Sequence, residues 1–293
     1  MSRDTGGPGR VGPGVAVLLV LVGITSVQFG AAVAKDLFAR VEPTMLVWLR
    51  LASSALLLVA MSRPRLPGRT WPDWRAVLWL GLCLGVMNWS IYQAFARIPL
   101  GIAVTIEFVG PLTLAAVGSR RARDLLWVAL AAVGVALLGF GPGAVTAAGV
   151  GYAVLAGAAW AGYILATADT GRRWEGLDGL AVASAVASLG LLPFALRTGP
   201  EALGQTDVVV LGAVIGLMSS VIPYSCEMAA LRVLPPPVFS ILMSLEPVAA
   251  ALAAMVIVGE FLSPVHWVAM GCVLVATLGA TRSGSTWTGP APD

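Results

Sequence analysis

Two long apolar segments of the chain each carry one glutamate at a corresponding place. Glu107 lies in the stretch Thr-Ile-Glu-Phe-Val, and Glu246 lies in Ser-Leu-Glu-Pro-Val. The tripeptide Trp-Val-Ala follows these glutamates after 20 and 21 residues, and a glycine follows each tryptophan 12 residues later. We therefore predict a duplicated membrane protein with one acid at a matching place in each half. An ionisable side chain in hydrocarbon costs about 2.5–3.5 kcal/mol, so both acids are expected to face a polar site between the halves.

The composition of the chain favours a membrane protein over a soluble one. Apolar residues make up 58% of the 293 residues and charged residues only 11%, whereas a soluble domain carries about 25% charged residues. A nucleic acid is not an expected partner, because the basic residues do not gather on one predicted face. One histidine and three scattered cysteines offer no metal-ligand spacing, and no nucleophile elbow or phosphate-binding loop is present. We therefore expect no enzyme activity, no catalytic residues, no metal and no cofactor.

Ten apolar segments separated by short polar breaks are predicted to cross the bilayer as helices, since a crossing needs about 20 apolar residues. Residues 14–141 form the first predicted repeat and residues 142–281 the second. Residues 1–13 and 282–293 are rich in glycine, proline and serine and are predicted to be disordered tails. The predicted spans are 15–36, 43–61, 76–97, 100–118, 124–140, 145–167, 178–196, 207–230, 236–258 and 263–281.

The distribution of basic residues predicts the orientation of these spans. With both termini in the cytoplasm, 13 of the 18 Lys and Arg residues fall in cytoplasmic segments, and Arg50 is the one inside a span. This bias agrees with the positive-inside rule. Each half has an odd number of spans, so the two halves must insert with opposite topology. The expected fold class is an all-α integral membrane protein with ten transmembrane helices in two inverted five-helix repeats, located in the cell (inner) membrane.

Glu107 and Glu246 are the main candidates for substrate binding or proton coupling. At 1.5 Å per residue, Glu107 lies about 10 Å below one membrane face and Glu246 about 15 Å from the other, as expected of an inverted pair. A carboxyl group in an apolar setting can be neutral, so either acid could carry a proton. Pro111 deprives the carbonyl of Glu107 of its helical partner, which favours Glu107 as the carrier. The alternative is that the acids pair with Arg50 or with backbone groups and only hold helices together.

Further candidates lie in the third and eighth predicted spans. Both read Gly-x-Met, then a group of polar residues, then a tyrosine. Hydrogen bonds between helices could satisfy each polar group at about 0.6–2 kcal/mol. A wet cavity beside the glutamates explains better why such a group occurs in both halves. The candidates in these two spans are Asn88, Tyr92, Ser219 and Tyr224.

Other polar and aromatic residues leave alternatives open. Arg50, deep in the second span, could bind a substrate carboxylate or neutralise Glu107. Trp160 and Tyr163 could line the cavity or face lipid. Glu227 and Glu260 lie near predicted span ends, where a solvated or structural role is expected.

Several stretches resemble the drug/metabolite transporter superfamily with two EamA-type repeats, and more narrowly the bacterial threonine/homoserine exporter group. They are Ala-Arg-Ile-Pro-Leu-Gly-Ile-Ala-Val-Thr-Ile-Glu at 96–107 with Gly-Pro at 110–111, Leu-Asp-Gly-Leu-Ala at 177–181, and Ile-Leu-Met-Ser-Leu-Glu-Pro at 241–247. The resemblance covers the chain apart from its tails and implies an inner-membrane exporter. One departure is that the first half has Gly118-Ser119 where the second has Gly259-Glu260.

We therefore expect a secondary active exporter of small metabolites such as threonine or homoserine, working by alternating access and coupled to protons. A drug or nucleotide-sugar transporter of the same fold is the alternative within transport. A membrane scaffold or a lipid-modifying enzyme is the alternative outside it. The expected partners are the small-molecule substrate, protons and the lipid bilayer, and a homodimer is left open.

The predicted topology can be tested with reporter cysteines placed near Arg65 and Arg121. Both positions should be shielded from a membrane-impermeant thiol reagent in intact cells, because both fall in predicted cytoplasmic segments. Labelling at either position from outside would contradict the orientation.

Overall fold

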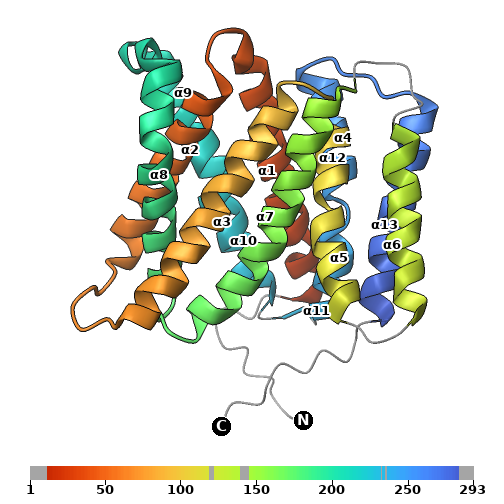
Figure 1. Cartoon of the computed structure of the whole chain (residues 1–293), viewed down its shortest axis with the longest axis horizontal. Coiled ribbons are helices and arrows are strands. Elements are labelled where there is room, and N and C mark those ends of the chain that lie inside the picture. The colour runs from red at the N-terminus through yellow and green to blue at the C-terminus, as the bar shows by residue number, and fades with distance from the viewer. Residues whose placement is uncertain (1–11, 119–121, 139–144, 232, 235, 284–293) are drawn as a thin grey trace, which may run out of the picture.

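The computed structural model of the chain describes residues 12–118, 122–138, 145–231, 233–234 and 236–283. Within these ranges the protein is helical and contains no β-strand. The helices stand side by side, and α1 (Pro13–Asp36) begins at the same end of the molecule at which α13 (Pro264–Ser283) ends (Figure 1). We call this the terminal end. The opposite end, which holds residues 37–42 and 258–263, is the distal end.

Unbroken helices occupy seven of the predicted segments within the described ranges. Besides α1 and α13 they are α2 (Pro43–Ser62), α3 (Trp71–Phe95), α6 (Ala122–Leu137), α7 (Ala147–Gly171) and α8 (Asp178–Thr198). Helix α1 begins at Pro13 and α13 continues to Ser283, close to the predicted tail boundaries at 13 and 282. Residues 1–11 and 284–293 of the predicted tails, and the predicted repeat boundary at 141, lie outside the described residues.

Six helical stretches among the described residues are long and apolar enough to cross a membrane. They are Gly14–Ala39, Pro43–Ser62, Trp71–Phe95, Ala147–Gly171, Asp178–Thr198 and Thr206–Glu227. Shorter apolar helices cover 100–114, 126–137, 246–257 and 264–279. The prediction of an all-α membrane protein is thus confirmed.

Local sequence explains where several helices begin. Thr70 and Asp73 form a capping box at the start of α3, in which each side chain bonds the backbone of the other residue. The Thr146 side chain accepts a hydrogen bond from the N–H of Gly149 at 3.1 Å and caps α7. Proline occupies the first turn of α1, α2 and α3. A backbone N–H in the first turn has no partner within the helix, so proline costs no helical hydrogen bond there.

Three predicted spans are interrupted in the structure. The segment 100–118 consists of α4 (Leu100–Glu107) and α5 (Val109–Gly118), which meet at Phe108. The segment 236–257 consists of α11 (Pro236–Met243) and α12 (Glu246–Ile257). Pro111 and Pro247 follow these breaks, and each lacks the N–H that would bond the carbonyl four residues earlier.

The third interruption is a π-helical turn near Pro223. It joins α9 (Thr206–Gly216) to α10 (Ile222–Leu231) over residues Leu217–Val221. Ser26 of α1 donates to the carbonyl of Met218 at 2.7 Å, and Ser54 of α2 donates to that of Gly216 at 3.3 Å. Backbone carbonyls displaced from the regular helical pattern are therefore satisfied by hydroxyls of neighbouring helices, as membrane depth requires.

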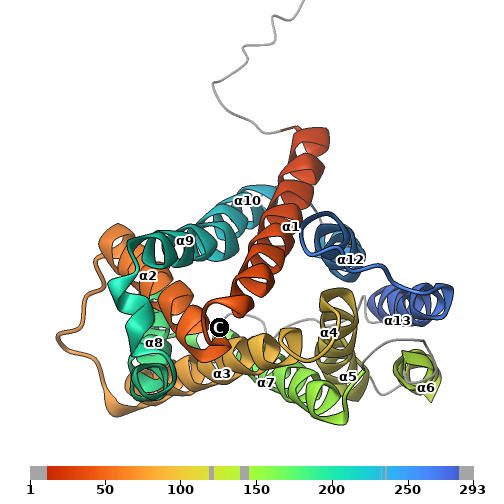
Figure 2. The same cartoon turned by 90° about the horizontal axis from the view of Figure 1, so that it is seen from above.

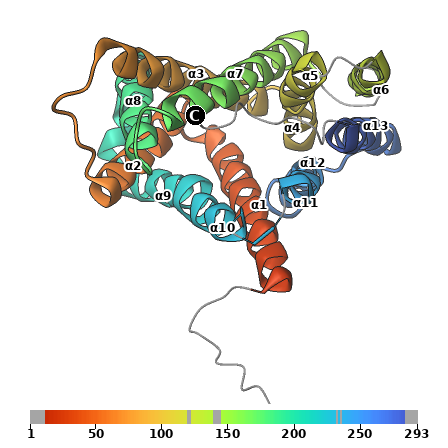
Figure 3. The ribbon, with the colours of Figure 1, turned by 90° about the horizontal axis from the view of Figure 1, so that it is seen from below.

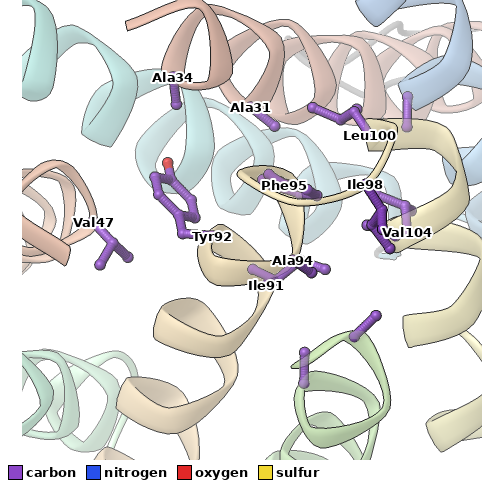
Figure 4. Close-up of a cluster of buried hydrophobic side chains, with 14 of the residues drawn as sticks. Ala31, Ala34, Val47, Ile91, Tyr92, Ala94, Phe95, Ile98, Leu100 and Val104 are labelled. Atoms are coloured by element: carbon purple, nitrogen blue, oxygen red, sulfur yellow. The ribbon is translucent and has the colours of Figure 1, made fainter. Parts of the chain in front are cut away.

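The two end-on views show how the helices are arranged (Figures 2 and 3). Helix α1 runs between the α9–α10 helix and α12, while α3 and α7 pack against each other across from it. Helices α2 and α8 pack together at one side, and α6 and α13 at the other. Apolar side chains of α1 to α4 meet around Tyr92 and Phe95, which are both buried (Figure 4).

Close helix approach depends on glycines at particular places. A methyl group on Gly157 of α7 would lie 2.6 Å from the carbonyl oxygen of Glu107, and one on Gly110 would collide with the backbone of Gly157. One on Gly81 of α3 would lie 2.7 Å from the side chain of Val186 on α8. These contacts agree with the packing role expected of small residues in membrane helices.

Substituting Gly157 should therefore destabilise the protein. We expect Gly157→Ala to cost about 1–3 kcal/mol, because α7 would be pushed away from the break between α4 and α5. Gly151→Ala is the matched control, since it lies on the same helix with nothing within 4 Å of the added methyl group. Thermal unfolding in detergent should show a lower midpoint for Gly157→Ala only. Equal midpoints for the two variants would disprove the close approach.

Candidate functional site

Both candidate glutamates lie at the interruptions of the helices that carry them. Glu107 is the last residue of α4, and Glu246 is the first residue of α12. Helices α4 and α12 pack against each other, and a methyl group on Gly101 would lie 2.8 Å from the Cβ of Ala251. Each acid therefore sits at the end of a half-helix. The two half-helices lie side by side between the acids and the distal end.

Electrostatic interactions connect the two glutamates to each other and to Arg50. Glu107 interacts with the positive charge of Arg50 on α2, and Glu246 interacts with the negative charges of Glu107 and Glu227. Among the described side chains, the ion pairs within 4 Å do not include Glu107, Glu246 or Arg50. The tight structural ion pair considered as an alternative is thus not formed in this conformation.

Arg50 and Tyr92 form a second polar pair next to the acids. The guanidinium carbon of Arg50 lies 5.6 Å from the centre of the Tyr92 ring. Tyr92 is fully buried and its hydroxyl interacts with Arg50, whereas the Nε of Arg50 has no hydrogen-bond partner among the described residues. Leaving buried polar groups unpaired is costly, so such groups mark a place where a ligand or water can bind. A guanidinium and a phenol together suit a carboxylate.

The other predicted site residues have more varied surroundings. Asn88 is buried and donates to the carbonyl of Leu84 in its own helix at 2.8 Å. Trp160 packs edge to face against Phe108, at the α4–α5 break, with ring centres 4.9 Å apart. Ser219 is buried in the π-helical turn, where its hydroxyl lies against Gly30 of α1.

Two tyrosines complete the predicted set. Tyr163 is half-buried on α7 and packs against the apolar core that contains Tyr92. The Tyr224 side chain lies outside the described residues. A single cavity bordered by all of these residues remains a prediction.

Glu227 was expected to be solvated or structural, but it interacts electrostatically with Glu246. It lies in α10, and α10 and α12 both pack against α1. A methyl group on Gly23 of α1 would lie 3.6 Å from the Cβ of Cys226, next to Glu227. Counting residues from the end of a straight helix placed Glu227 near the membrane surface. The membrane-compatible stretch Thr206–Glu227 ends at this residue, so helix length gave no sign of its interaction with Glu246.

Two hollows on the described structure contain none of the predicted site residues. One has a volume of about 320 Å³ and lies between α3 and α8, with Gly85, Trp89, Leu191 and Phe194 among its mainly apolar lining. The other, of about 620 Å³, lies between the α2–α3 and α7–α8 connections. Because neither contains a grouping of half-buried acids and a half-buried cation, we place the candidate site around Arg50, Tyr92 and the three glutamates.

Known proteins resemble this chain over most of its length. Over 277 residues it is 38% identical to the threonine/homoserine exporter RhtA of Escherichia coli (strain K12), with 90% of each chain covered. The RhtA of Salmonella typhimurium (strain LT2) is 37% identical over the same length and coverage. One crystal structure shares the fold, with a TM-score of 0.60 and 18% identity over 93% of this chain and 96% of the other.

A family comparison agrees with these relatives. Residues 147–282, which fall in the second half of the chain, match the EamA-like transporter family. The relatives are exporters, and the helices of this chain are apolar enough to cross a membrane. The chain therefore belongs to the EamA-like transporter family of membrane proteins.

Proposed function

We propose that this protein is a secondary exporter of small zwitterionic metabolites, with amino acids such as threonine and homoserine as substrates. The observation that carries this proposal is that Arg50, which lies over the Tyr92 ring, interacts with Glu107 at one helix interruption, and Glu107 interacts with Glu246 at another. A zwitterion offers a carboxylate to Arg50 and Tyr92 and an ammonium group to Glu107 or Glu246. The threonine/homoserine exporters to which the chain is similar support this substrate class.

The proposal includes ten crossings in two inverted repeats, with both termini in the cytoplasm. Helices occupy all ten predicted segments within the described residues, and the start of α1 and the end of α13 share one end of the molecule. The interruptions at Glu107 and Glu246 occur at matching places of the two halves. Discontinuous helices at corresponding positions are typical of binding sites at the interface of inverted repeats. Alternating access then exposes the site first to the cytoplasm and next to the outside.

The balance of charge at the site supports a proposal of proton coupling. Glu246 interacts with Glu227 and Glu107, and among the described residues Arg50 is the cation that acts on Glu107. A fully ionised group would carry excess negative charge in an apolar setting, which is costly. Taking up protons removes that cost, and releasing them on the other side of the membrane couples transport to the proton gradient.

The surroundings of the two central acids favour Glu246 as the proton carrier. Glu107 has Arg50 as a counter-charge, whereas the charged groups of the described residues that act on Glu246 are both carboxylates. The carbonyl of Glu107 that Pro111 leaves without a helical partner faces Gly157 of α7. We therefore assign proton coupling to Glu246 and substrate binding to Glu107, the reverse of what the position of Pro111 suggests by itself.

Glutamine substitutions test this division of roles in inverted membrane vesicles. We expect Glu246→Gln to remove the dependence of threonine transport on the pH gradient while threonine exchange continues. Glu107→Gln should instead raise the KM for threonine, because it removes a partner of Arg50 and of the substrate. Asp207→Asn, which changes an exposed acid in an ion pair with Arg40, is the control. If both glutamine variants transport like the wild type across a pH series, neither acid is a coupling residue.

A substitution of Arg50 tests recognition of the substrate carboxylate. Losing a charged hydrogen-bonding partner costs about 1.5–3 kcal/mol, so Arg50→Gln should weaken threonine binding by about 10- to 150-fold. Threonine methyl ester, which lacks the carboxylate, should compete poorly in the wild type and no worse than threonine in Arg50→Gln. Arg40→Gln, at an exposed position, is the control. Unchanged discrimination in Arg50→Gln would count against this site.

The alternatives predict different results in the same vesicles. A drug or nucleotide-sugar transporter would show transport of those compounds and little of threonine. A membrane scaffold or a lipid-modifying enzyme would transport none of these compounds.

A further inference from the structure

A buried ion pair at the distal end joins three parts of the chain that are far apart in sequence. Glu260, in the connection after α12, pairs with Lys35 at the end of α1 at 2.5 Å. Lys35 also donates to the carbonyl of Ile98 at 2.7 Å, and the second carboxylate oxygen of Glu260 accepts from the N–H of Leu100 at 2.9 Å. The Lys35 and Glu260 side chains are only 12% and 20% exposed, so this is not an ordinary surface pair.

The contacts of Glu260 connect the outer ends of both half-helices. Its N–H bonds back to the carbonyl of Ala254 at 3.2 Å, past Gly259 with a φ of +72°, which fixes Glu260 to the end of α12. The carboxylate of Glu260 accepts a hydrogen bond from the N–H of Leu100, the first residue of α4. This N–H has no partner within the helix, and the N-terminus of a helix favours negative charge. Glu260 therefore ties the start of α4 to the end of α12.

The same two half-helices carry the site acids at their opposite ends. Helix α4 runs from Leu100 to Glu107, and α12 runs from Glu246 to the connection that holds Glu260. Between these ends the two helices pack closely at Gly101 and Ala251. Many residues of α4 and α12 are buried and apolar. These residues lie between the acids and the distal end. The buried residues are Leu100, Ile102, Ala103, Val104, Ile106, Ala250, Ala251, Ala253 and Ala254.

We propose that Lys35 and Glu260 are positioning residues that latch α4 to α12 and hold the site closed toward the distal end. Opening on that side requires the latch to break, which exposes both charges to water. The inference rests on the proposed function, which assigns the distal end to the outside of the cell. In the first half, Gly118-Ser119 stands where Gly259-Glu260 stands in the second half, and serine cannot form an ion pair. A latch on the outer side suits an exporter that waits for substrate from the cytoplasm.

Removing either charge should shift the protein toward the outward-open state. In the closed state, Glu260→Gln leaves the mostly buried Lys35 without a counter-charge. Lys35→Met likewise leaves Glu260 without a counter-charge. Water can solvate the remaining charge fully only when the outer side opens, because each side chain is at most 20% exposed in the closed state. The expected effect is therefore a change in the side from which the site can be reached, which a purely structural role would not produce.

The test uses a reporter cysteine at Val104, a buried residue of α4, after replacement of Cys83, Cys226 and Cys272. A membrane-impermeant maleimide is applied to intact cells, and the labelling rate is measured. Glu260→Gln and Lys35→Met should each raise the rate about tenfold or more, as expected when a minor state becomes well populated. Asp207→Asn, which breaks the exposed ion pair with Arg40 at the same end, should leave the rate unchanged. Rates for the two latch variants that match the control would overturn the proposal.

A second experiment decides the question if those variants fail to fold. Cysteines at Lys35 and Glu260 are joined by a short, reducible bifunctional thiosulfonate reagent, and threonine transport in vesicles is followed. The bridge should abolish transport, and a reductant should restore it to the level before bridging. Transport that continues in the bridged protein would overturn the proposal. If threonine is never transported but labelling of Val104→Cys still rises in the latch variants, the latch stands and the proposed substrate is wrong.

Discussion

The cost of leaving a polar group without a partner inside the bilayer is the constraint on which most of this structure depends. It explains why hydroxyls of α1 and α2 reach the carbonyls of the π-helical turn, with Ser54 also 2.8 Å from Ser220. It also explains why Lys35 has a carboxylate and a carbonyl as partners at the distal end. Some buried polar atoms of the described residues nevertheless lack such a partner, among them the Nε of Arg50 and side-chain atoms of Gln28 and Ser90.

Interrupted helices and close packing are linked consequences of the same constraint. A proline that removes a backbone hydrogen bond leaves a carbonyl exposed, and a neighbouring helix must approach closely to cover it. Gly157 permits that approach at Glu107, and Gly101 permits it where α4 meets α12. The acids thus lie at breaks that the surrounding helices support. Small movements of the half-helices can change the surroundings of both acids together.

Family membership and the chemistry of the candidate site bear on different properties of the protein. A crystal structure at 18% identity shares the fold over most of both chains, and a shared fold alone does not decide a substrate. The relatives at 37% and 38% identity are threonine/homoserine exporters. The proposed contacts of a zwitterion with Arg50, Tyr92 and the glutamates can be tested separately from this family relationship.

The sequence by itself determined the helices, because long apolar segments and proline positions act locally along the chain. The predicted segments 43–61 and 178–196 match α2 and α8 to within two residues, and Pro111 and Pro247 marked the interrupted spans. The sequence also singled out Glu107 and Glu246, since charge inside an apolar segment is visible without a structure. Only the tertiary structure decided that Glu227 acts on Glu246 and that Glu260 pairs with Lys35. These interactions join residues on different helices, and they depend on helix rotation and on the bend near Pro223, which local sequence patterns do not fix.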